Sequence, residues 1–341
     1  MKNNLKKITG IKTQQIQRQA VGYYTLRFVP PTAGFKLPIP LRFAFVIGFS
    51  QIITAVLLLL IIAVLPSISW SEDQKPPASE QKPTELKQEE DKVTGQVDLS
   101  VLSAYILRGQ ELSRDSVVVQ PAVTLSYKGF SVIIWGNLDT KPYSAIGNKH
   151  SAKYTETDFT ISYSKKFGIV QVTPGYIYYA LGAPYAGGTD PLDSQELFLT
   201  IGLDTILSPT VTAYKEIDHY HQWYFLLGFS HTFALHEKIG LKLAASASYL
   251  LSTDETTYSK YNSDFLPTRD KYNNFHDGTI SVSLPIAVYN TLSVTPTISY
   301  VFPLCNDAKY EMRARGLQGL GNLSDKDGAY LYGGVTLNYA F

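Results

Sequence analysis

From residue 97 to the C-terminus, hydrophobic and polar residues alternate with a period of two in twelve segments of about ten residues each. This period places successive side chains on opposite faces of a β-strand. About ten residues is also the length that a tilted strand needs to cross a membrane. We therefore expect strands over residues 97–108, 117–128, 130–138, 155–167, 169–181, 195–204, 210–218, 221–235, 239–251, 279–289, 292–302 and 329–341.

The two faces of these segments differ in chemistry. In segment 279–289, Ile280 and Val282 fall on one face, whereas Thr279, Ser281 and Ser283 fall on the other. The polar face is mostly small and hydroxylic, with few of the Lys and Glu residues that solubilise the outside of a β-sandwich. A water-filled lumen surrounded by lipid-facing side chains fits this composition better. The pattern favours a transmembrane β-barrel, and a soluble β-sandwich, whose strands also alternate, is the alternative.

The connections between the segments alternate between short and long. Short links lie at 128–129, 167–168, 208–209, 236–238 and 290–291, and the opposite links are long at 139–154, 182–194, 252–278 and 303–328 and shorter at 109–116 and 219–220. Outer-membrane barrels show this asymmetry, with their short turns towards the periplasm. An even number of strands returns both ends of the barrel to that side. The expected fold class is all-β, an antiparallel transmembrane barrel of about twelve strands.

The last predicted strand ends on an aromatic side chain. Leu337, Tyr339 and Phe341 share one face of segment 329–341, and the chain stops at Phe341. An unpaired strand edge is unfavourable, and a closed barrel removes it by pairing the last strand with the first. A terminal Phe after alternate apolar residues resembles the signal that outer-membrane barrels present to the barrel-assembly machinery. We expect these three residues to be that assembly signal and the last strand to pair with the strand that begins at Val97.

Four prolines fall inside predicted strands, namely Pro121, Pro174, Pro285 and Pro296. A proline cannot donate a backbone hydrogen bond to a neighbouring strand. Each of the four is therefore expected at a bulge or at an unpaired position of its ladder.

The N-terminal part of the chain differs from the rest in charge and hydropathy. Residues 1–42 carry eight Lys and Arg and no acid, so the remainder has 22 basic and 29 acidic residues although the whole chain has a net charge of +1. Residues 43–65 form an uncharged apolar run of 23 residues, followed by small residues before a polar stretch. This order is typical of an export signal, with cleavage expected near Ser69, but the run is also long enough for an uncleaved membrane anchor.

The stretch between this apolar run and the first strand has an unusual composition. Residues 71–95 are rich in Pro, Glu, Gln and Lys and contain almost nothing apolar. Such a segment buries too little surface to offset its ordering entropy. We therefore expect three regions: a basic extension with a signal peptide or transmembrane helix over 1–70, a disordered periplasmic linker over 71–95 and a barrel over 96–341.

Candidate catalytic chemistry is sparse. The single Cys305 excludes an internal disulfide and a paired-cysteine metal site, and the composition is unlike that of nucleic-acid-binding chains, so no metal, cofactor or nucleic acid is expected. Two sets of side chains could serve a barrel hydrolase: His219, His221 and His231 around segment 221–235, and Asp190, Asp193 and Asp218 with His219 at the rim of the predicted loops. Their spacing forms no specific catalytic motif, so we predict that the chain is not an enzyme. A barrel enzyme acting on lipid or envelope substrates is an alternative, and it requires a Ser and a His within hydrogen-bond reach.

Charged residues on the predicted inward face are candidates for lining a pore. They are Arg108, Glu156, Asp158, Glu196, Asp204, Glu216, Asp218 and Lys242. A charge facing lipid would cost roughly 2–4 kcal/mol near the midplane, so their place on the polar face supports the predicted register. Because acids outnumber bases six to two in this set, an open lumen should prefer cations mildly. Alternatively, these groups pair across the lumen and plug it.

The first three predicted strands resemble the N-terminal signature of a family of bacterial barrels. The similar motifs are Tyr105-Ile106-Leu107-Arg108-Gly109, Gln120-Pro121-Ala122-Val123, Gly129-Phe130 and Trp135-Gly136-Asn137, together with Glu156, Asp158 and the closing aromatic strand. This pattern is similar to that of the TorF-type porins, over about residues 97–341. The basic extension and the linker depart from it. The resemblance implies a pore in the outer membrane of a Gram-negative-type bacterium.

These observations lead to one functional expectation and two alternatives. We expect an outer-membrane porin, embedded in outer-membrane lipid, through which small solutes diffuse passively. The alternatives are the barrel enzyme and a plugged structural or adhesive barrel whose loops at 252–278 and 303–328 meet partners outside the cell. The sequence gives no indication of the oligomeric state.

Deletion of Phe341 tests the role of the terminal strand. Because the assembly machinery recognises this end, the shortened protein should insert poorly into the membrane, and any transport through inserted copies should change less. Fractionation and quantification of the membrane-inserted protein measure this effect. Normal membrane levels of the shortened protein would refute the assignment.

Overall fold

The computed structural model describes residues 92–144, 151–186, 188–316 and 328–341. The predicted basic extension, signal peptide and nearly all of the linker lie outside the described residues. Among the described residues, no helix has the length and apolar character needed to cross a membrane.

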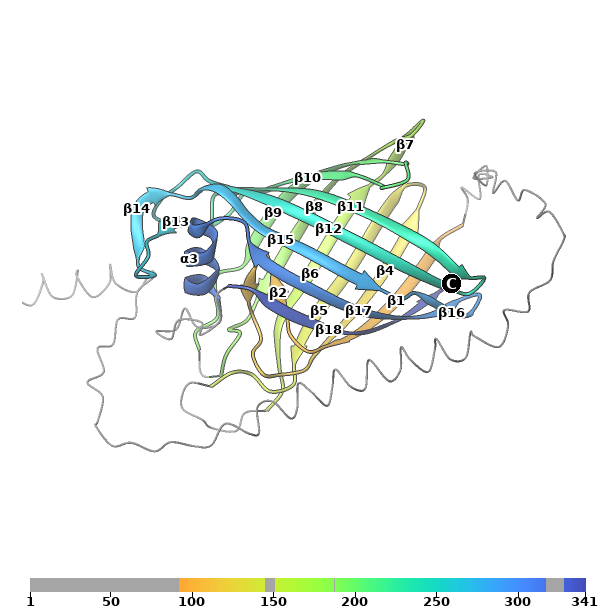
Figure 1. The fold of residues 1–341 in the computed structure, drawn as a ribbon, viewed down its shortest axis with the longest axis horizontal. Coiled ribbons are helices and arrows are strands. Elements are labelled where there is room, and N and C mark those ends of the chain that lie inside the picture. The colour runs from red at the N-terminus through yellow and green to blue at the C-terminus, as the bar shows by residue number, and fades with distance from the viewer. Residues whose placement is uncertain (1–91, 145–150, 187, 317–327) are drawn as a thin grey trace, which may run out of the picture. The chain divides into compact units, whose positions relative to one another are not determined.

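A closed antiparallel β-barrel of twelve wall positions forms the described structure, as predicted (Figure 1). The wall strands are β1 (Thr94–Leu102), β4 (Val118–Tyr127), β5 (Phe130–Asp139), β6 (Lys153–Tyr163) with β7 (Lys165–Phe167), β8 (Val170–Leu181), β9 (Ser194–Leu203), β10 (Thr210–Glu216), β11 (Gln222–His236), β12 (Ile239–Ser252), β15 (Asn273–Ser283) with β16 (Ile286–Tyr289), β17 (Leu292–Pro303) and β18 (Tyr330–Ala340). The pairs β6/β7 and β15/β16 each occupy one position, because both members pair with the same neighbouring strand. The sheet closes where β18 pairs with β1.

Three segments differ from their predicted boundaries. The first strand ends at Leu102, and the residues that follow form a short hairpin of β2 (Ile106–Leu107) and β3 (Gln110–Glu111). The stretch predicted as loop 252–278 contains a hairpin of β13 (Ser259–Tyr261) and β14 (Pro267–Lys271) and the first residues of β15. The stretch predicted as loop 303–328 contains a helix, α3 (Asn306–Arg315). In Figure 1, α3, β13 and β14 lie at one end of the barrel, which we call the loop end, and β16 and the C-terminus lie at the other, the turn end.

The outer face of the wall is apolar. On β9, Leu197, Leu199 and Ile201 are between 42% and 50% exposed, whereas Glu196, which precedes them on the opposite face, is 2% exposed. At the turn end, the exposed aromatic side chains include Tyr127, Phe130, Tyr163, Phe167, Tyr289 and Phe341. A soluble sandwich turns its apolar face inward, so this arrangement excludes that alternative and suits a barrel surrounded by lipid with an aromatic girdle.

The inner face towards the turn end is lined by hydroxyl groups. These groups pair between neighbouring strands, with oxygen–oxygen distances of 2.5–2.9 Å: Ser100–Thr336, Ser126–Ser131, Ser164–Thr173, Thr200–Thr212 and Ser283–Thr297. Each pair satisfies part of its own hydrogen-bonding capacity and still leaves oxygen acceptors for water. The small hydroxylic face seen in the sequence therefore forms an inner surface whose groups can bind water.

The prolines lie where the ladders are interrupted, as predicted. Pro121 pairs with β1, Pro174 with β9 and Pro296 with β18, and each lacks a register partner on its other side. Pro285 lies in the break between β15 and β16. Proline has no N–H to donate, so it fits positions at which only one of the two neighbouring strands pairs with it.

The closing seam between β1 and β18 is tight. Its register runs from Gln96–Ala340 to Leu102–Gly334, and Gly95 and Phe341 exchange two backbone hydrogen bonds of 2.8 and 2.9 Å. The predicted pairing of the last strand with the first is confirmed, with Val97 opposite Tyr339. A Cβ atom at Gly334 would lie 1.9 Å from the carbonyl oxygen of Val101 across the seam. Only glycine allows the two strands to approach this closely.

Substitution of Gly334 by Ala should therefore open the seam. We expect a destabilisation of about 2 kcal/mol from the forced displacement of β1, and a smaller fraction of barrels whose gel mobility changes on boiling. Gly202→Ala is the matched control, because its Cβ would meet only Thr210 Cγ2 at 3.6 Å. Equal folded fractions for the two variants would contradict a tight seam.

Candidate functional site

A short hairpin carries Arg108 into the lumen at the loop end. Leu107 and Gln110 pair across a two-residue turn in which Arg108 has φ +48° and Gly109 has φ +74°. Two positive φ angles are typical of the tight turns that join adjacent strands, and glycine at the second position is favoured there. Gly109 also faces α3, since a Cβ atom would lie 2.5 Å from Met312 Cε.

The guanidinium of Arg108 binds to the far side of the barrel. The hairpin follows β1, and β9, which carries Glu196, lies five positions away along the wall. Arg108 Nη1 and Nη2 each donate to one carboxylate oxygen of Glu196 at 2.7 Å. The rings of Tyr214 and Tyr224 lie 5.0 and 4.5 Å from the guanidinium carbon. The hydroxyl of Tyr179 donates to Glu196 Oε2 at 2.8 Å.

We call the wall residues Tyr179, Glu196, Tyr214 and Tyr224 the guanidinium cage. A bidentate carboxylate and aromatic faces are the two contacts that a planar guanidinium makes best. The side chains of Arg108 and Glu196 are only 16% and 3% exposed, so this ion pair is largely removed from water.

Two β-bulges turn consecutive side chains inward near the same end. On β6, the register shifts opposite Asn137 and Leu138, and both Thr155 and Glu156 are buried inside the barrel. Asn137 Nδ2 donates to Thr155 Oγ1 at 2.7 Å, and the hydroxyl of Tyr105 donates to Glu156 Oε2 at 2.9 Å. A bulge adds one residue to a strand and so interrupts its in–out alternation.

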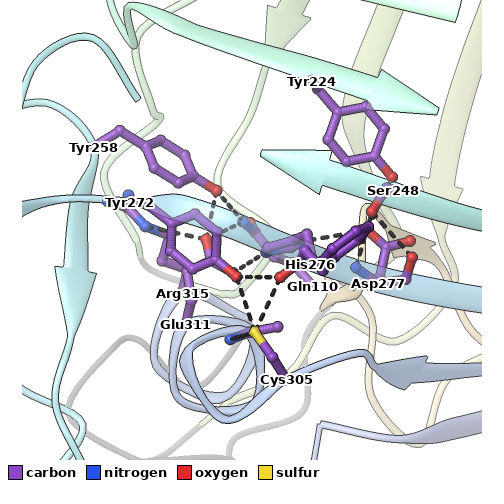
Figure 2. A network of polar contacts seen from close by, with 12 residues as sticks. Gln110, Tyr224, Ser248, Tyr258, Tyr272, His276, Asp277, Cys305, Glu311 and Arg315 are labelled. Atoms are coloured by element: carbon purple, nitrogen blue, oxygen red, sulfur yellow. Dashed lines mark hydrogen bonds and ion pairs between the residues drawn. The ribbon is translucent and has the colours of Figure 1, made fainter. Parts of the chain in front are cut away.

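The second bulge places His276 and Asp277 inside, opposite Ser248 on β12. His276 Nδ1 lies 2.9 Å from Asp277 Oδ1, and Nε2 lies 2.8 Å from Glu311 Oε2 on α3 (Figure 2). Both ring nitrogens face carboxylates, an arrangement that an imidazolium with two N–H donors satisfies fully. Asp277 also accepts hydrogen bonds from Tyr224 at 2.9 Å and from Ser248 at 2.7 Å. The wall is therefore joined to α3 through His276.

Glu311 is the centre of this network on the helix side. Its Oε1 accepts from Gln110 Nε2 at 3.0 Å and from the hydroxyl of Tyr258, and Arg315 Nε lies 3.2 Å away as an ion-pair partner. The Arg315 guanidinium in turn lies 3.7 Å over the Tyr258 ring. Gln110 belongs to the hairpin, so the same carboxylate contacts β3, α3 and the loop before β13.

The protonation of Glu311 links this network to pH. Burial by itself would raise the pKa of the Glu311 carboxyl, but His276, Arg315 and Tyr258 hold that pKa below its usual range. A depressed pKa stabilises the folded state above the pKa of an unfolded glutamate, and the stabilisation is lost as pH falls through the folded value. The docking of α3 is therefore favoured at neutral pH.

A cavity of about 430 Å³ lies beside these groups. Its charged lining residues are Arg108, Glu156, Glu196 and Arg315, and its aromatic ones are Tyr105, Tyr179, Tyr185, Tyr220, Tyr258 and Tyr261. A second cavity of about 260 Å³ is lined mostly by Ser, Thr and Ala side chains together with Lys242. The charges of the lumen are thus concentrated in the first cavity, near the hairpin.

The structure places the predicted pore-lining residues in different surroundings. Arg108, Glu156 and Glu196 meet at the first cavity, and Asp158 lies two residues from Glu156 on the same face. Lys242 is exposed at the second cavity. Asp204 is exposed beyond the end of β9 and forms an ion pair with Lys166 at 2.5 Å.

Glu216 is the last residue of β10, and Asp218 lies in the link between β10 and β11. Both oxygens of Glu216 are occupied, because the backbone N–H groups of residues 218–221 donate to them at 2.6–3.1 Å and Ser194 Oγ donates at 3.1 Å. Asp218 accepts from Gln195 at 2.9 Å and lies 3.2 Å from His219 Nδ1. Glu216 thereby fixes the conformation of this link.

The acids considered for a hydrolase also shape loops. Asp190 accepts a hydrogen bond from the backbone N–H of Ala183 at 2.8 Å, and Asp193 accepts one from that of Leu181 at 3.0 Å. In the part of the chain that the structure describes, no Ser hydroxyl hydrogen-bonds a His ring, and no group of His, Cys, Asp and Glu is arranged to hold a metal ion. The Ser–His pair that would favour a barrel hydrolase is therefore not found among these residues.

Sequence reasoning missed the aromatic members of the cage and the network around Glu311. Residues 273–277 were assigned to a loop because the bulge at His276 and Asp277 breaks the alternation. One signal was present in the sequence: Tyr214 and Glu216 share one face of their strand, and Gln222 and Tyr224 share one face of the following strand. This spacing could have identified an inward-facing aromatic patch. Nothing in the pattern of residues 306–315 indicated a helix in the opening of the barrel at the loop end, which we call the mouth.

Comparisons with known proteins give similarity of shape only. No protein-family model matches the chain, and no curated protein matches it. Among solved structures, the "KdgM porin" is similar, with 11% identity over 72% of this chain and 99% of that chain and a TM-score of 0.43. The "NanC porin" has 10% identity, covers 71% of this chain and 98% of its own, and has a TM-score of 0.42. The "COG4313 outer membrane channel from Pseudomonas putida F1" has 9% identity, covers 79% of this chain and 100% of its own, and has a TM-score of 0.41. Because these TM-scores are below 0.5, the functional argument rests on the geometry described above, and membership of the TorF-type porins stays a prediction.

Replacing Glu311 by Ala tests the anchoring of α3. The change leaves His276 buried without its helix partner, which should weaken the docking of α3 by about 3 kcal/mol and speed proteolysis within residues 306–315 roughly a hundredfold. Limited proteolysis of the folded barrel in detergent measures the rate. Glu255→Ala is the control, because Glu255 is exposed and lies 3.7 Å from Lys271 in a surface ion pair, which contributes little. Equal rates in the two variants would contradict an anchoring role for Glu311.

Proposed function

We propose that the chain is an outer-membrane porin through which small solutes diffuse passively. The observation that carries this proposal is the inverted polarity of the closed wall, with apolar side chains outside and paired hydroxyl groups inside. A closed barrel satisfies all backbone hydrogen bonds in lipid, and a hydroxylic inner surface keeps water in the lumen. Transport by diffusion needs no catalytic group.

The proposed location in the outer membrane follows from the same wall. The short turns at the end that carries the C-terminus would face the periplasm, and the apolar run 43–65 would direct export through the inner membrane. Leu337, Tyr339 and Phe341 would present the assembly signal. The exposed ring of Phe341 lies against Gly95 on the first strand, so recognition and closure would involve the same few residues.

Selectivity in this proposal depends on the charged groups at the loop end. Seven acidic residues are buried in the described structure: Glu111, Asp139, Glu156, Glu196, Glu216, Asp277 and Glu311. No Lys or Arg of the described residues is buried to the same degree, since even Arg108 and Arg315 keep 16% and 19% of their side chains exposed. An excess of acidic groups around a water path favours cations, but the first cavity itself is lined by two acids and two bases, and Glu216, Asp277 and Glu311 are occupied by hydrogen bonds or ion pairs. The predicted mild cation preference stays a prediction that rests on the larger number of acids.

A plugged structural barrel is the second candidate, and one observation favours it. The β2–β3 hairpin and α3 occupy the mouth and are bound to the wall through Arg108–Glu196 and His276–Glu311. A plug of this kind would block diffusion unless part of it moves. The two candidates therefore differ in whether current passes.

Single-channel recording in a planar bilayer distinguishes them. The folded barrel should give reproducible conductance steps, and under a KCl gradient the reversal potential should shift towards that of K⁺. Silence from a sample that shows the heat-dependent gel mobility of a folded barrel would contradict the pore and support the plugged barrel. A reversal potential that favours Cl⁻ would contradict the cation preference alone.

A further inference from the structure

We propose that the guanidinium cage is a solute-binding site of the lumen, which Arg108 fills as a tethered ligand. Solutes that carry a guanidinium group would compete with Arg108 for it. The binding site rests on the geometry of the wall, and its use during transport rests on the proposed pore function.

The cage matches a guanidinium more closely than any other cation. Glu196 takes two parallel N–H···O bonds of 2.7 Å, and the rings of Tyr214 and Tyr224 both lie within 5.0 Å of the guanidinium carbon. A planar guanidinium can make the bidentate pair and stack on aromatic faces at the same time. An ammonium ion is a compact point charge without this fork, so the cage should bind it more weakly.

The wall holds the cage together without the help of the hairpin. Its four members come from four successive strands, β8 to β11, and Tyr214 is the direct cross-strand partner of Tyr224. Tyr179 donates to Glu196, and Tyr224 donates to Asp277, so both tyrosines are oriented by bonds that do not involve Arg108. Removing the arginine side chain should therefore leave a preorganised, empty site.

The natural occupant sits in an unfavourable backbone conformation. Arg108 has φ +48° at the first position of its two-residue turn, where Asn, Asp or Gly would be accommodated more easily. Strain of this kind persists where the surrounding structure fixes it, and it often marks a functional position. The contacts with the cage, and not the turn itself, therefore hold the Arg108 side chain in its position.

A cavity at the loop end adjoins part of the cage. Arg108, Glu196 and Tyr179 all line the cavity of about 430 Å³, which also contains the rings of Tyr220 and Tyr261. The cage thus borders a space large enough for a small organic cation.

Competition should be strongly affected by the tether. A tethered ligand has an effective concentration of about millimolar or more, so a free solute must exceed this level to displace Arg108. In Arg108→Ala the competitor is absent. We therefore expect methylguanidinium to bind Arg108→Ala at least about tenfold more tightly than the native chain.

The experiment uses the full barrel folded in detergent, with heat-dependent gel mobility as the check of folding. Methylguanidinium is titrated while its methyl resonance is followed by NMR, and methylammonium at equal ionic strength is the control solute. Lys215→Ala is the matched control variant, because Lys215 follows Tyr214 on β10 and so falls on the opposite face of that strand, where its Nζ lies 5.4 Å from the centre of the Trp223 ring. It should bind as the native chain does.

The double variant Arg108→Ala/Glu196→Gln should lose the gain in affinity, because the bidentate carboxylate is gone. Tighter binding in Arg108→Ala that disappears in the double variant supports the site. The proposal is overturned if Arg108→Ala binds no more tightly than the native chain, if methylammonium binds equally well, or if the double variant keeps the gain. If Arg108→Ala does not fold, Arg108→Lys takes its place, since lysine keeps the charge but not the fork and should also let methylguanidinium bind more tightly.

Bilayer recordings separate this proposal from that of the pore. If the variant conducts, methylguanidinium should reduce its current at concentrations that leave the native current unchanged. Binding without any current in either protein would leave the site intact and refute the pore, whereas current without binding would refute the site and leave the pore intact.

Discussion

Closure of the sheet is the constraint on which the rest of the structure depends. In lipid, each backbone N–H and C=O group needs a partner within the protein, so a strand edge cannot be left open. The chain meets this requirement by bringing residues 94–102 and 330–340 together across its whole barrel sequence. The approach at Gly334 and the exchange of hydrogen bonds between Gly95 and Phe341 follow from it. Once the wall is closed, its inner face becomes a separate compartment in which polar groups can be arranged.

Within this compartment, the irregular positions of the wall are the ones that carry the site. Regular strands turn every second residue inward, which gives hydroxyl pairs towards the turn end. The two bulges break this rule and bring Thr155 with Glu156, and His276 with Asp277, to the inner surface. Consecutive inward side chains raise the local density of polar groups, so the networks that bind the hairpin and α3 begin at these bulges.

The sequence predicts the wall strands well, because each of them faces lipid on one side and the lumen on the other. All twelve wall positions, the short turns and the pairing of the last strand with the first followed from the period of two, because burial in lipid imposes that period residue by residue. Inside the mouth no such two-sided environment exists. The period of two predicts a strand as far as Arg108, although Gly109 beside it is a turn signal. The helix 306–315 packs against β3, β13, β15 and β17, which the local pattern of residues cannot indicate. Glu196 lies on the inner face of β9, but its pairing with Arg108 depends on a hairpin that crosses the lumen, which alternation cannot indicate.

The contents of the mouth are held by two different kinds of force, and this difference separates what is fixed from what can exchange. Beneath α3, Val301, Ala308, Met312 and Tyr330 form an apolar cluster against which Ile106 at the base of the hairpin also packs. Water cannot replace such contacts, so the helix and the hairpin base remain in place. The tip differs, because Arg108 is bound by a carboxylate and two aromatic rings, which another guanidinium group could contact in the same way. Under the proposed exchange, the Arg108 side chain would therefore leave its site while the hairpin stays docked, and the occupancy of the lumen would change without unfolding of the hairpin or α3.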